Sequence, residues 1–408
     1  MNDTTTPAVA AVPAGIALYM AVVQFLFVTT WTIYVIFLPK LLETAGLPAS
    51  YMPMILIVDQ LVFMVMDIYV GVAADRAQRT LGKVGPLMIG MTVVSCIAFL
   101  ALPFLAHLGA VVALGLMMTW VITSSAMRAP PWVLLSKYAA APSVPRLNTL
   151  LLCGLAAGGA IAPYLGITLK NVDPRIPFVL SSLTLLAATA GIVYVEKQLK
   201  QRPIAQPAAT PEPAELAGRT WPFLLGLLLL AAGFQIHFSI NTAGQFLKFA
   251  KPADLEWLMP LFWVGFGVLM MPGSALCKRF GTLQVMVVSA VLGAVGAYLA
   301  ANAGSLDMLI AAQIIAGGAW GSMLMCGFTA AMDAGRSGRE GLALGLLFAA
   351  LAFATLTRIG AVLAGVPKQS EYAPLLAMAP VACWLAGALV IGVLMMRKRA
   401  VPVVSRAA

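Results

Sequence analysis

Long apolar runs recur from one end of the chain to the other, and they restrict the fold more than any other feature. Each run is close to the roughly 20 residues that cross the hydrocarbon core of a bilayer. Of the 408 residues, 61% are apolar and only 10% are charged, whereas a soluble domain carries about 25% charged residues. Backbone groups inside a bilayer must be satisfied within their own segment, so we predict an all-α membrane protein. The twelve predicted spans cover residues 14–39, 51–74, 84–105, 109–135, 148–170, 176–195, 221–247, 257–277, 283–303, 306–331, 341–364 and 372–396.

The positive charges indicate how the spans are oriented. If the N-terminus is cytoplasmic, most of the 25 lysines and arginines fall in loops on the cytoplasmic side, and Arg128 and Arg358 fall inside spans. This asymmetry follows the positive-inside rule. We therefore predict a multi-pass protein of a bacterial-type inner membrane with both termini cytoplasmic and no cleaved signal peptide. The formal charge of +10 is assigned to orientation and to contact with membrane lipid, not to nucleic acid.

A polar, proline-rich stretch divides the spans six and six. We predict an N-terminal six-helix bundle over residues 1–196, a cytoplasmic linker over 197–220 and a C-terminal six-helix bundle over 221–408. The second and eighth spans end alike, with Gly71 or Gly273 shortly before a cluster of cations. Such an echo between halves is typical of transporters built from parallel repeats.

No residue pattern in the chain points to a metal, a cofactor or catalysis. The five cysteines lie within or at the ends of spans without metal-ligand spacing, so we expect small core residues. The two histidines, His107 and His237, are far apart, and no nucleotide-binding loop is visible. We expect neither an enzyme nor a metal or cofactor site.

The second span ends in the motif GVAADRAQRTLGK, which contains Gly71, Asp75, Arg76, Arg79 and Lys83. This motif resembles the loop 2–3 signature of the major facilitator superfamily. The resemblance implies two pseudo-symmetric six-helix bundles, and it assigns these five residues to a cytoplasmic gate that is closed in the outward-open state. We expect the carboxylate to face a helix N-terminus and the arginines to reach carboxylates on neighbouring helices. The general enrichment of lysine and arginine in cytoplasmic loops would account for the arginines, but not for Gly71 and Asp75 at this spacing.

Two acids, Asp59 and Asp67, lie deep in the same span, beside Gln60. An acid at this depth costs about 2.5–3.5 kcal/mol on insertion scales, and it usually faces a partner or a polar path. Gln60 and Asp67 are seven residues apart and therefore share a helix face. We interpret all three as candidate substrate or proton-site residues. An internal pairing that only stiffens the bundle is the alternative.

The run from Asp67 to Gly71, with the loop after it, resembles the glycoside–pentoside–hexuronide cation symporters, the branch of melibiose permease. The resemblance places Asp67 on a cation-site carboxylate, whereas Phe63 and Arg128 stand where that branch carries further acids. We therefore do not expect sodium coupling. Asp67 and Arg128 lie at similar depth, and we predict that they form an ion pair, because either charge alone would be far costlier. Protonation or an anionic substrate could break this ion pair, and the pair could in this way couple the movement of protons to the movement of substrate.

The seventh span carries His237, Asn241 and Gln245 at positions i, i+4 and i+8, which predicts one polar stripe. Such a stripe could bind a polar solute, or it could hold helices together. Arg358 in the eleventh span is a further candidate for the site, although its side chain could reach the membrane surface instead.

These features favour a monomeric secondary transporter that moves a small polar, anionic organic solute by alternating access with protons. A multidrug efflux antiporter is the first alternative, because the glycine-rich fifth span partly resembles the antiporter motif, although helix packing explains its glycines equally well. A non-transporting membrane sensor on the same fold is the second. The substrate itself and the direction of transport are left open by the sequence.

Overall fold

The computed structural model is helical throughout the part of the chain that it describes, residues 12–81, 83–139, 141–201, 219–335 and 338–399. Twelve helices there are long and apolar enough to cross a membrane, and they coincide with the twelve predicted runs. The first half contains α1 (Ala14–Thr44), α2 (Met52–Leu81), α3 (Gly85–Leu105), α4 (Ala110–Ser124), α5 (Ala129–Tyr138), α6 (Val144–Thr168) and α7 (Arg175–Lys200). The second contains α8 (Thr220–Ile236), α9 (Thr242–Phe246), α10 (Leu255–Leu258), α11 (Pro260–Phe280), α12 (Thr282–Ala301), α13 (Leu306–Ala334), α14 (Glu340–Leu363) and α15 (Ala373–Arg399).

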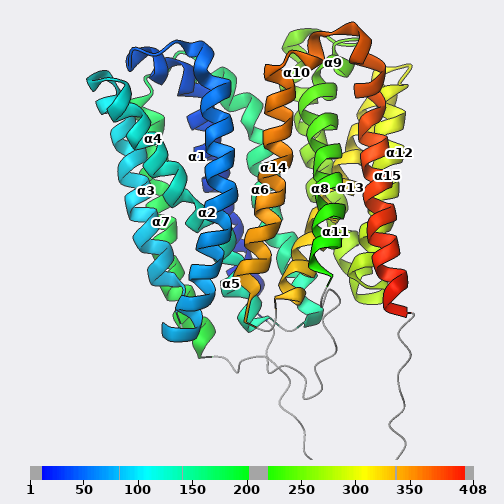
Figure 1. The fold of residues 1–408 in the computed structure, drawn as a ribbon, viewed down its shortest axis with the longest axis horizontal. Coiled ribbons are helices and arrows are strands. Elements are labelled where there is room, and N and C mark those ends of the chain that lie inside the picture. The colour runs from blue at the N-terminus through cyan, green and yellow to red at the C-terminus, as the bar shows by residue number, and fades with distance from the viewer. Residues whose placement is uncertain (1–11, 82, 140, 202–218, 336–337, 400–408) are drawn as a thin grey trace, which may run out of the picture.

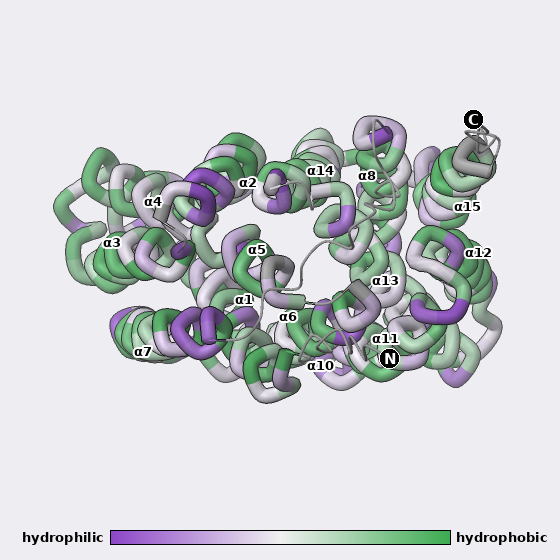
Figure 2. The backbone as a smooth tube through the Cα atoms, turned by 90° about the horizontal axis from the view of Figure 1, so that it is seen from below, coloured by the Kyte–Doolittle hydropathy of each residue, from purple (hydrophilic) through white to green (hydrophobic). Residues whose placement is uncertain are grey.

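The two halves stand side by side, with their helices running across the same layer (Figure 1). We call the end at which α7 finishes and α8 begins the linker side. Seen from that side, α3, α4 and α7 lie at one edge of the molecule and α12 and α15 at the other (Figure 2). The halves meet where α2 packs on α14 and α6 packs on α11. Helix α7 continues to Lys200, so residues 197–200 of the predicted linker are its last turn, and most of the rest lies outside the described residues.

The fourth predicted span, residues 109–135, is not one continuous helix. A 3-10 turn separates α4 from α5, and the break falls at Arg128. Pro130 and Pro131 lack the N–H groups that would continue the helix. The carbonyl of Met127, which an N–H at Pro131 would normally satisfy, instead accepts a hydrogen bond of 2.9 Å from Gln24 Nε2 on α1. A side chain from a neighbouring helix therefore stabilises the break that carries Arg128.

The same device appears in the second half. The seventh span is interrupted by a π-helical turn at residues 237–241. At the end of this turn, Asn241 Nδ2 donates a hydrogen bond of 2.7 Å to the carbonyl of Leu376 on α15. That carbonyl lies four residues before Pro380, which has no N–H to offer it. Two side-chain amides thus satisfy carbonyls that prolines leave free, as a bilayer interior requires.

We expect Gln24→Leu to destabilise the protein by about 1–3 kcal/mol, because it leaves the buried Met127 carbonyl unsatisfied. Pro131→Ala would return an N–H to that carbonyl, so the Gln24→Leu loss should shrink in the Pro131→Ala background. Thermal unfolding of the four proteins in detergent measures both effects. Equal Gln24→Leu losses in the two backgrounds would contradict the proposed relation between the amide and the proline.

The glycines of α6 act in packing. A Cβ on Gly154 would collide with the backbone of Ala21 on α1, and one on Gly159 would lie inside the Trp263 indole of α11. Close helix approach therefore accounts for these two positions without an antiporter motif. Cys96, Cys277 and Cys326 are buried and Cys153 and Cys383 are partly buried, and the sulfurs of Cys277 and Cys326 lie 3.6 Å apart.

Candidate functional site

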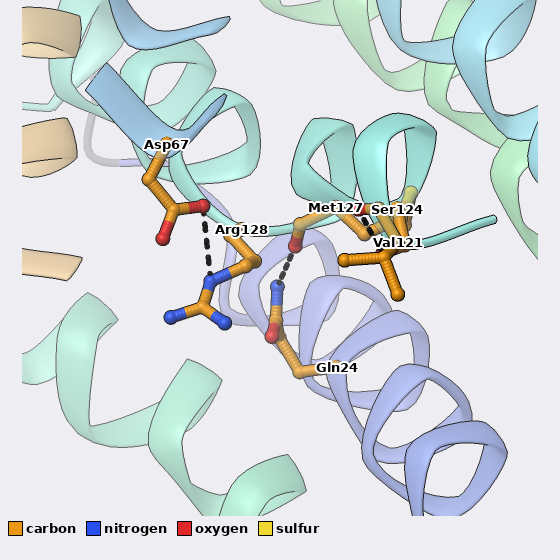
Figure 3. Close-up of polar contacts among 6 residues, drawn as sticks. All are labelled: Gln24, Asp67, Val121, Ser124, Met127 and Arg128. Atoms are coloured by element: carbon orange, nitrogen blue, oxygen red, sulfur yellow. Dashed lines mark hydrogen bonds and ion pairs between the residues drawn. The ribbon is translucent and has the colours of Figure 1, made fainter. Parts of the chain in front are cut away.

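An ion pair lies at the break of the fourth span. Arg128 Nε is 3.1 Å from Asp67 Oδ1 on α2, and the two side chains are 15% and 0% exposed (Figure 3). Because of the break, Arg128 is the N-cap residue of α5 and not an interior residue of a continuous helix. The pairing expected from the matching depths of the two residues is present, while its role in transport stays a prediction.

Two aromatic rings hold the guanidinium of Arg128. Its central carbon lies 4.6 Å from the ring centre of Phe63 and 4.9 Å from that of Phe348. Phe63 is one helical turn before Asp67 on α2, and Phe348 belongs to α14 in the other half. Cation–π contacts of this kind contribute about 0.5–2 kcal/mol each. The arginine therefore touches both halves, and the phenylalanine that replaces an expected acid is one of its partners.

The terminal nitrogens of Arg128 are the unused part of the site. Figure 3 shows Nε directed at Asp67 and the two terminal nitrogens directed away from it. The side chain is 15% exposed, and among the described residues no acceptor is bonded to these terminal nitrogens. A guanidinium offers five N–H donors in a planar fork. Four of them are thus available to an incoming acceptor.

Asp59 lies in a different environment from Asp67. It is fully buried, and its Oδ2 accepts a hydrogen bond of 3.0 Å from the Tyr34 hydroxyl on α1. Its Oδ1 has no partner in the described structure. The Tyr34 ring packs on Trp120 of α4 at 4.5 Å and on Trp31 at 5.5 Å. The carboxyl group is therefore fully buried and makes a single hydrogen bond, from a tyrosine whose ring packs against two tryptophans.

The other predicted site residues do not join the pair. Gln60 is buried beside Asp59. Arg358 is partly buried on α14, and its Nε has no hydrogen-bond partner within the described residues. Within the second half, Gln235 Nε2 of α8 donates a hydrogen bond of 2.9 Å to the Thr355 hydroxyl of α14. No contact that the structure describes connects Arg358 to the Asp67–Arg128 pair.

The predicted polar stripe of the seventh span is wrong at Asn241. The π-helical turn adds a residue to the helical turn, so Asn241 points to α15, whereas His237 and Gln245 point to α13. There His237 Nε2 lies 3.0 Å from Gln313 Oε1, and Gln313 Nε2 donates to Gln245 Oε1 at 3.2 Å. Both stripe residues are buried. Interhelical attachment, the alternative left open by the sequence, describes this cluster better than an open binding face.

On the linker side, Asp75 bridges the two halves. Its Oδ1 accepts from the Gly341 N–H at 2.7 Å and its Oδ2 from the Leu342 N–H at 3.0 Å. These are the first-turn donors of α14, whose own N-cap residue is Arg339 and offers no side-chain acceptor to them. A carboxylate from α2 therefore does the work of an N-cap and also complements the helix dipole.

The same contact explains Gly71 but not the basic residues. A Cβ on Gly71 would collide with the Gly341 carbonyl, so only glycine allows α2 and α14 to come this close. Arg76, Arg79 and Lys83 are exposed, and no ion pair of theirs appears among the described residues. Both oxygens of Asp75 accept backbone N–H groups, and the expectation that the arginines reach carboxylates on neighbouring helices stays a prediction.

Further contacts close the linker side between the halves. Trp132 of α5 stacks on Phe328 of α13, with ring centres 4.1 Å apart. Asn148 Nδ2 of α6 donates to the Thr329 hydroxyl of α13 at 2.9 Å. We call Asp75 with its α14 partners, the Trp132–Phe328 stack and the Asn148–Thr329 bond the linker-side closure. It lies between Arg128 and the linker end of the bundle.

Solved structures share this architecture. A bacterial homologue of the iron transporter ferroportin in an outward-facing state has a TM-score of 0.68 at 14% identity, over 94% of this chain and 100% of that chain. The E. coli fucose:proton symporter has a TM-score of 0.66 at 14% identity, over 93% of this chain and 98% of that chain. The human organic anion transporter TETRAN has a TM-score of 0.68 at 14% identity, over 94% of this chain and 99% of that chain. The chain has the major facilitator fold. No protein-family model and no curated protein sequence matches it.

On this major facilitator fold, two buried residues carry contacts that no motif indicated. Gln313 connects His237 with Gln245, and only its polarity within an apolar run could have marked it. Glu196 of α7 accepts from the N–H groups of Val84 and Gly85 at 2.8 and 3.0 Å, and so caps α3. Its place in the last turns of an amphipathic helix looks like ordinary surface charge in the sequence.

Proposed function

We propose that the protein is a secondary active transporter that moves a small anionic organic solute by alternating access, with protons as the coupled ion. Fold likeness at 14% identity does not by itself carry function, so the proposal depends on the site. The observation that carries it is the guanidinium of Arg128, which lies between the two halves with its terminal nitrogens unpaired and partly exposed.

An anion suits this guanidinium for reasons of geometry. Two parallel N–H bonds from an arginine match a carboxylate. Phe63 and Phe348 flank the same group and would pack on the apolar part of a small organic acid. Since Phe63 and Asp67 belong to one half and Phe348 to the other, a bound anion would change contacts across the interface. That is the property an alternating-access site requires.

Protons are favoured over sodium by the ligands that are present. A hard cation needs several clustered oxygens, and within the described residues no group of three or more His, Cys, Asp or Glu side chains could hold a metal ion. Next to Asp67 stand Phe63 and Arg128 instead of further acids. The fucose:proton symporter among the solved neighbours accords with this choice.

The proposed location is a bacterial-type inner membrane, with the linker side in the cytoplasm. The lysines and arginines of the loops support this orientation through the positive-inside rule. The linker-side closure would then be the cytoplasmic gate, and the structure would correspond to a state closed to the cytoplasm. Asp75 and Gly71 are the residues we propose for that gate, with Arg76, Arg79 and Lys83 as its exposed basic rim.

Ligand binding tests the anion site directly. We expect an organic acid to raise the unfolding temperature of the purified protein, because a ligand stabilises the state to which it binds. A panel of acetate, lactate, succinate, citrate and glucuronate, with glucose and glycerol as uncharged controls, covers the range of sizes. Arg128→Gln should abolish the shift. A shift given by the uncharged compounds alone would contradict an anion site.

Coupling is tested by flux in proteoliposomes with the acid that gives the largest shift. We expect an imposed pH gradient to drive its accumulation and a sodium gradient at constant pH to have no effect. Sodium-dependent accumulation would overturn the reading of Phe63 and Arg128 as replacements for cation ligands. The Arg128→Gln protein serves as the control for leak.

A further inference from the structure

The two buried acids of α2 differ in the one respect that decides their charge. Asp67 has Arg128 at 3.1 Å. Asp59 has the Tyr34 hydroxyl and nothing else, and its Oδ1 is buried without a partner. The helices packed against α2 carry other titratable or charged groups in their spans, but in the described structure none of these contacts Asp59. Among the described side chains they are Tyr19, Lys40 and Glu43 on α1, Tyr51 in the 3-10 turn before α2, Tyr138 on α5, and Glu340 and Arg358 on α14, whereas α4 has none.

A bare carboxylate in such a place is very costly. The free-energy cost of transferring an unpaired ion into an apolar interior is larger than the free energy gained from one hydrogen bond to a neutral group. A buried acid therefore usually becomes neutral instead. A proton on Oδ1 leaves Oδ2 as the acceptor for Tyr34, which fits the contact that is seen. Asp67 has a guanidinium 3.1 Å away, and an opposite charge at that distance favours the ionised form of a carboxyl group.

We propose that Asp59 carries the coupled proton, while Asp67 and Arg128 handle the anion. This assignment depends on the proton-coupled transport proposed above. The O–H bond at Oδ1 forms with a proton from water on one side of the membrane and breaks when that proton passes to water on the other side. No other reactant is needed. In this structure the Asp59 carboxyl group is buried from both sides of the membrane, and it carries its proton.

Phe63 connects the two sites. Its ring lies 4.6 Å from the Arg128 guanidinium carbon and 5.4 Å from the Trp31 ring, and Trp31 packs on Tyr34. The acids are eight residues apart, roughly 12 Å along the helix, so direct interaction between them is weak. An anion that draws Arg128 away from Phe63 would free that ring to move, and through Trp31 it would disturb the packing of Tyr34, which holds the hydrogen bond to Asp59. Movement of this ring is the coupling step that we assign to the structure.

Infrared difference spectroscopy tests the protonation state without any substrate. We expect the purified protein in lipid nanodiscs at neutral pH to show the C=O stretch of a protonated carboxylic acid. Asp59→Asn should remove this band, and Tyr34→Phe should shift it by removing the hydrogen-bond donor. Asp67→Asn is the matched control and should leave it in place. A band lost in Asp67→Asn but kept in Asp59→Asn, or no band in the wild type, would overturn the assignment.

Transport separates this assignment from the proposed function. Asp59→Asn imitates the protonated form, so it should keep the thermal shift with the chosen organic acid and lose accumulation driven by a pH gradient at least tenfold. Phe63→Leu should weaken coupling while accumulation remains measurable. A wild type without pH-driven accumulation would defeat proton coupling itself. Full accumulation by Asp59→Asn beside an active wild type would defeat only the role of Asp59.

Discussion

Asp67→Asn and Arg128→Gln are each expected to lower the unfolding free energy by about 3–5 kcal/mol, the usual cost of removing one partner of a buried ion pair. Each variant leaves its partner charge deep in the membrane, where Asp67 is fully buried and Arg128 is 15% exposed. In Asp67→Asn, cation–π contacts with the Phe63 and Phe348 rings still stabilise the unpaired Arg128. In Arg128→Gln, these rings do not stabilise the unpaired Asp67 carboxylate. Arg128→Gln should therefore be the more damaging of the two.

The double variant Asp67→Asn/Arg128→Gln contains no orphan charge, so most of the stability should return. Transport should not return, because the guanidinium is the proposed anion ligand. A double-mutant cycle in detergent unfolding gives the coupling energy of the pair. Losses that simply add would mean that the two residues are not energetically paired. A double variant that still accumulates the organic acid would place the anion site elsewhere in the bundle.

The sequence predicted the features that follow from membrane burial itself. Twelve apolar runs imply twelve spanning helices, since lipid leaves no other way to satisfy the backbone. Asp67 and Arg128 could be paired from their depths alone, because two opposite charges in one bundle are cheapest together. Helix ends were less accurate. Helix α2 continues to Leu81, beyond the predicted end at 74, because apolarity marks the membrane and not the helix.

Contacts between distant segments could not be predicted from spacing. Phe63 was singled out in the sequence only as a replacement for an acid and not as a ring that contacts Arg128, and Phe348 reaches Arg128 from the other half. Asn241 was misplaced because a π-helical turn shifts every later side chain, and only its contact with the Leu376 carbonyl shows the shift. The sequence motif predicted that Asp75 would face a helix N-terminus, but it could not show that this helix is α14 of the other half.

Asp75 and Glu196 offer a matched pair of variants for the proposed gate. Both carboxylates accept two backbone N–H bonds at the start of a helix, Asp75 across the halves at α14 and Glu196 within one half at α3. Replacement by the amide turns one acceptor oxygen into a donor that faces an N–H group. Hydrogen bonds to charged groups contribute about 1.5–3 kcal/mol, so both variants should lose stability by amounts of that order.

Only Asp75→Asn should also open the linker side. The contact it weakens exists only while α2 and α14 are together, so its loss shifts the equilibrium between closed and open states by roughly 10-fold or more, given about 1.4 kcal/mol per factor of ten. A cysteine at Thr355, in a protein whose native cysteines are replaced by alanine, reports the opening. We expect a membrane-impermeant thiol reagent added from the linker side to label it faster in Asp75→Asn and at the parental rate in Glu196→Gln. Equal labelling in both variants would show that Asp75 stabilises the fold without holding a gate.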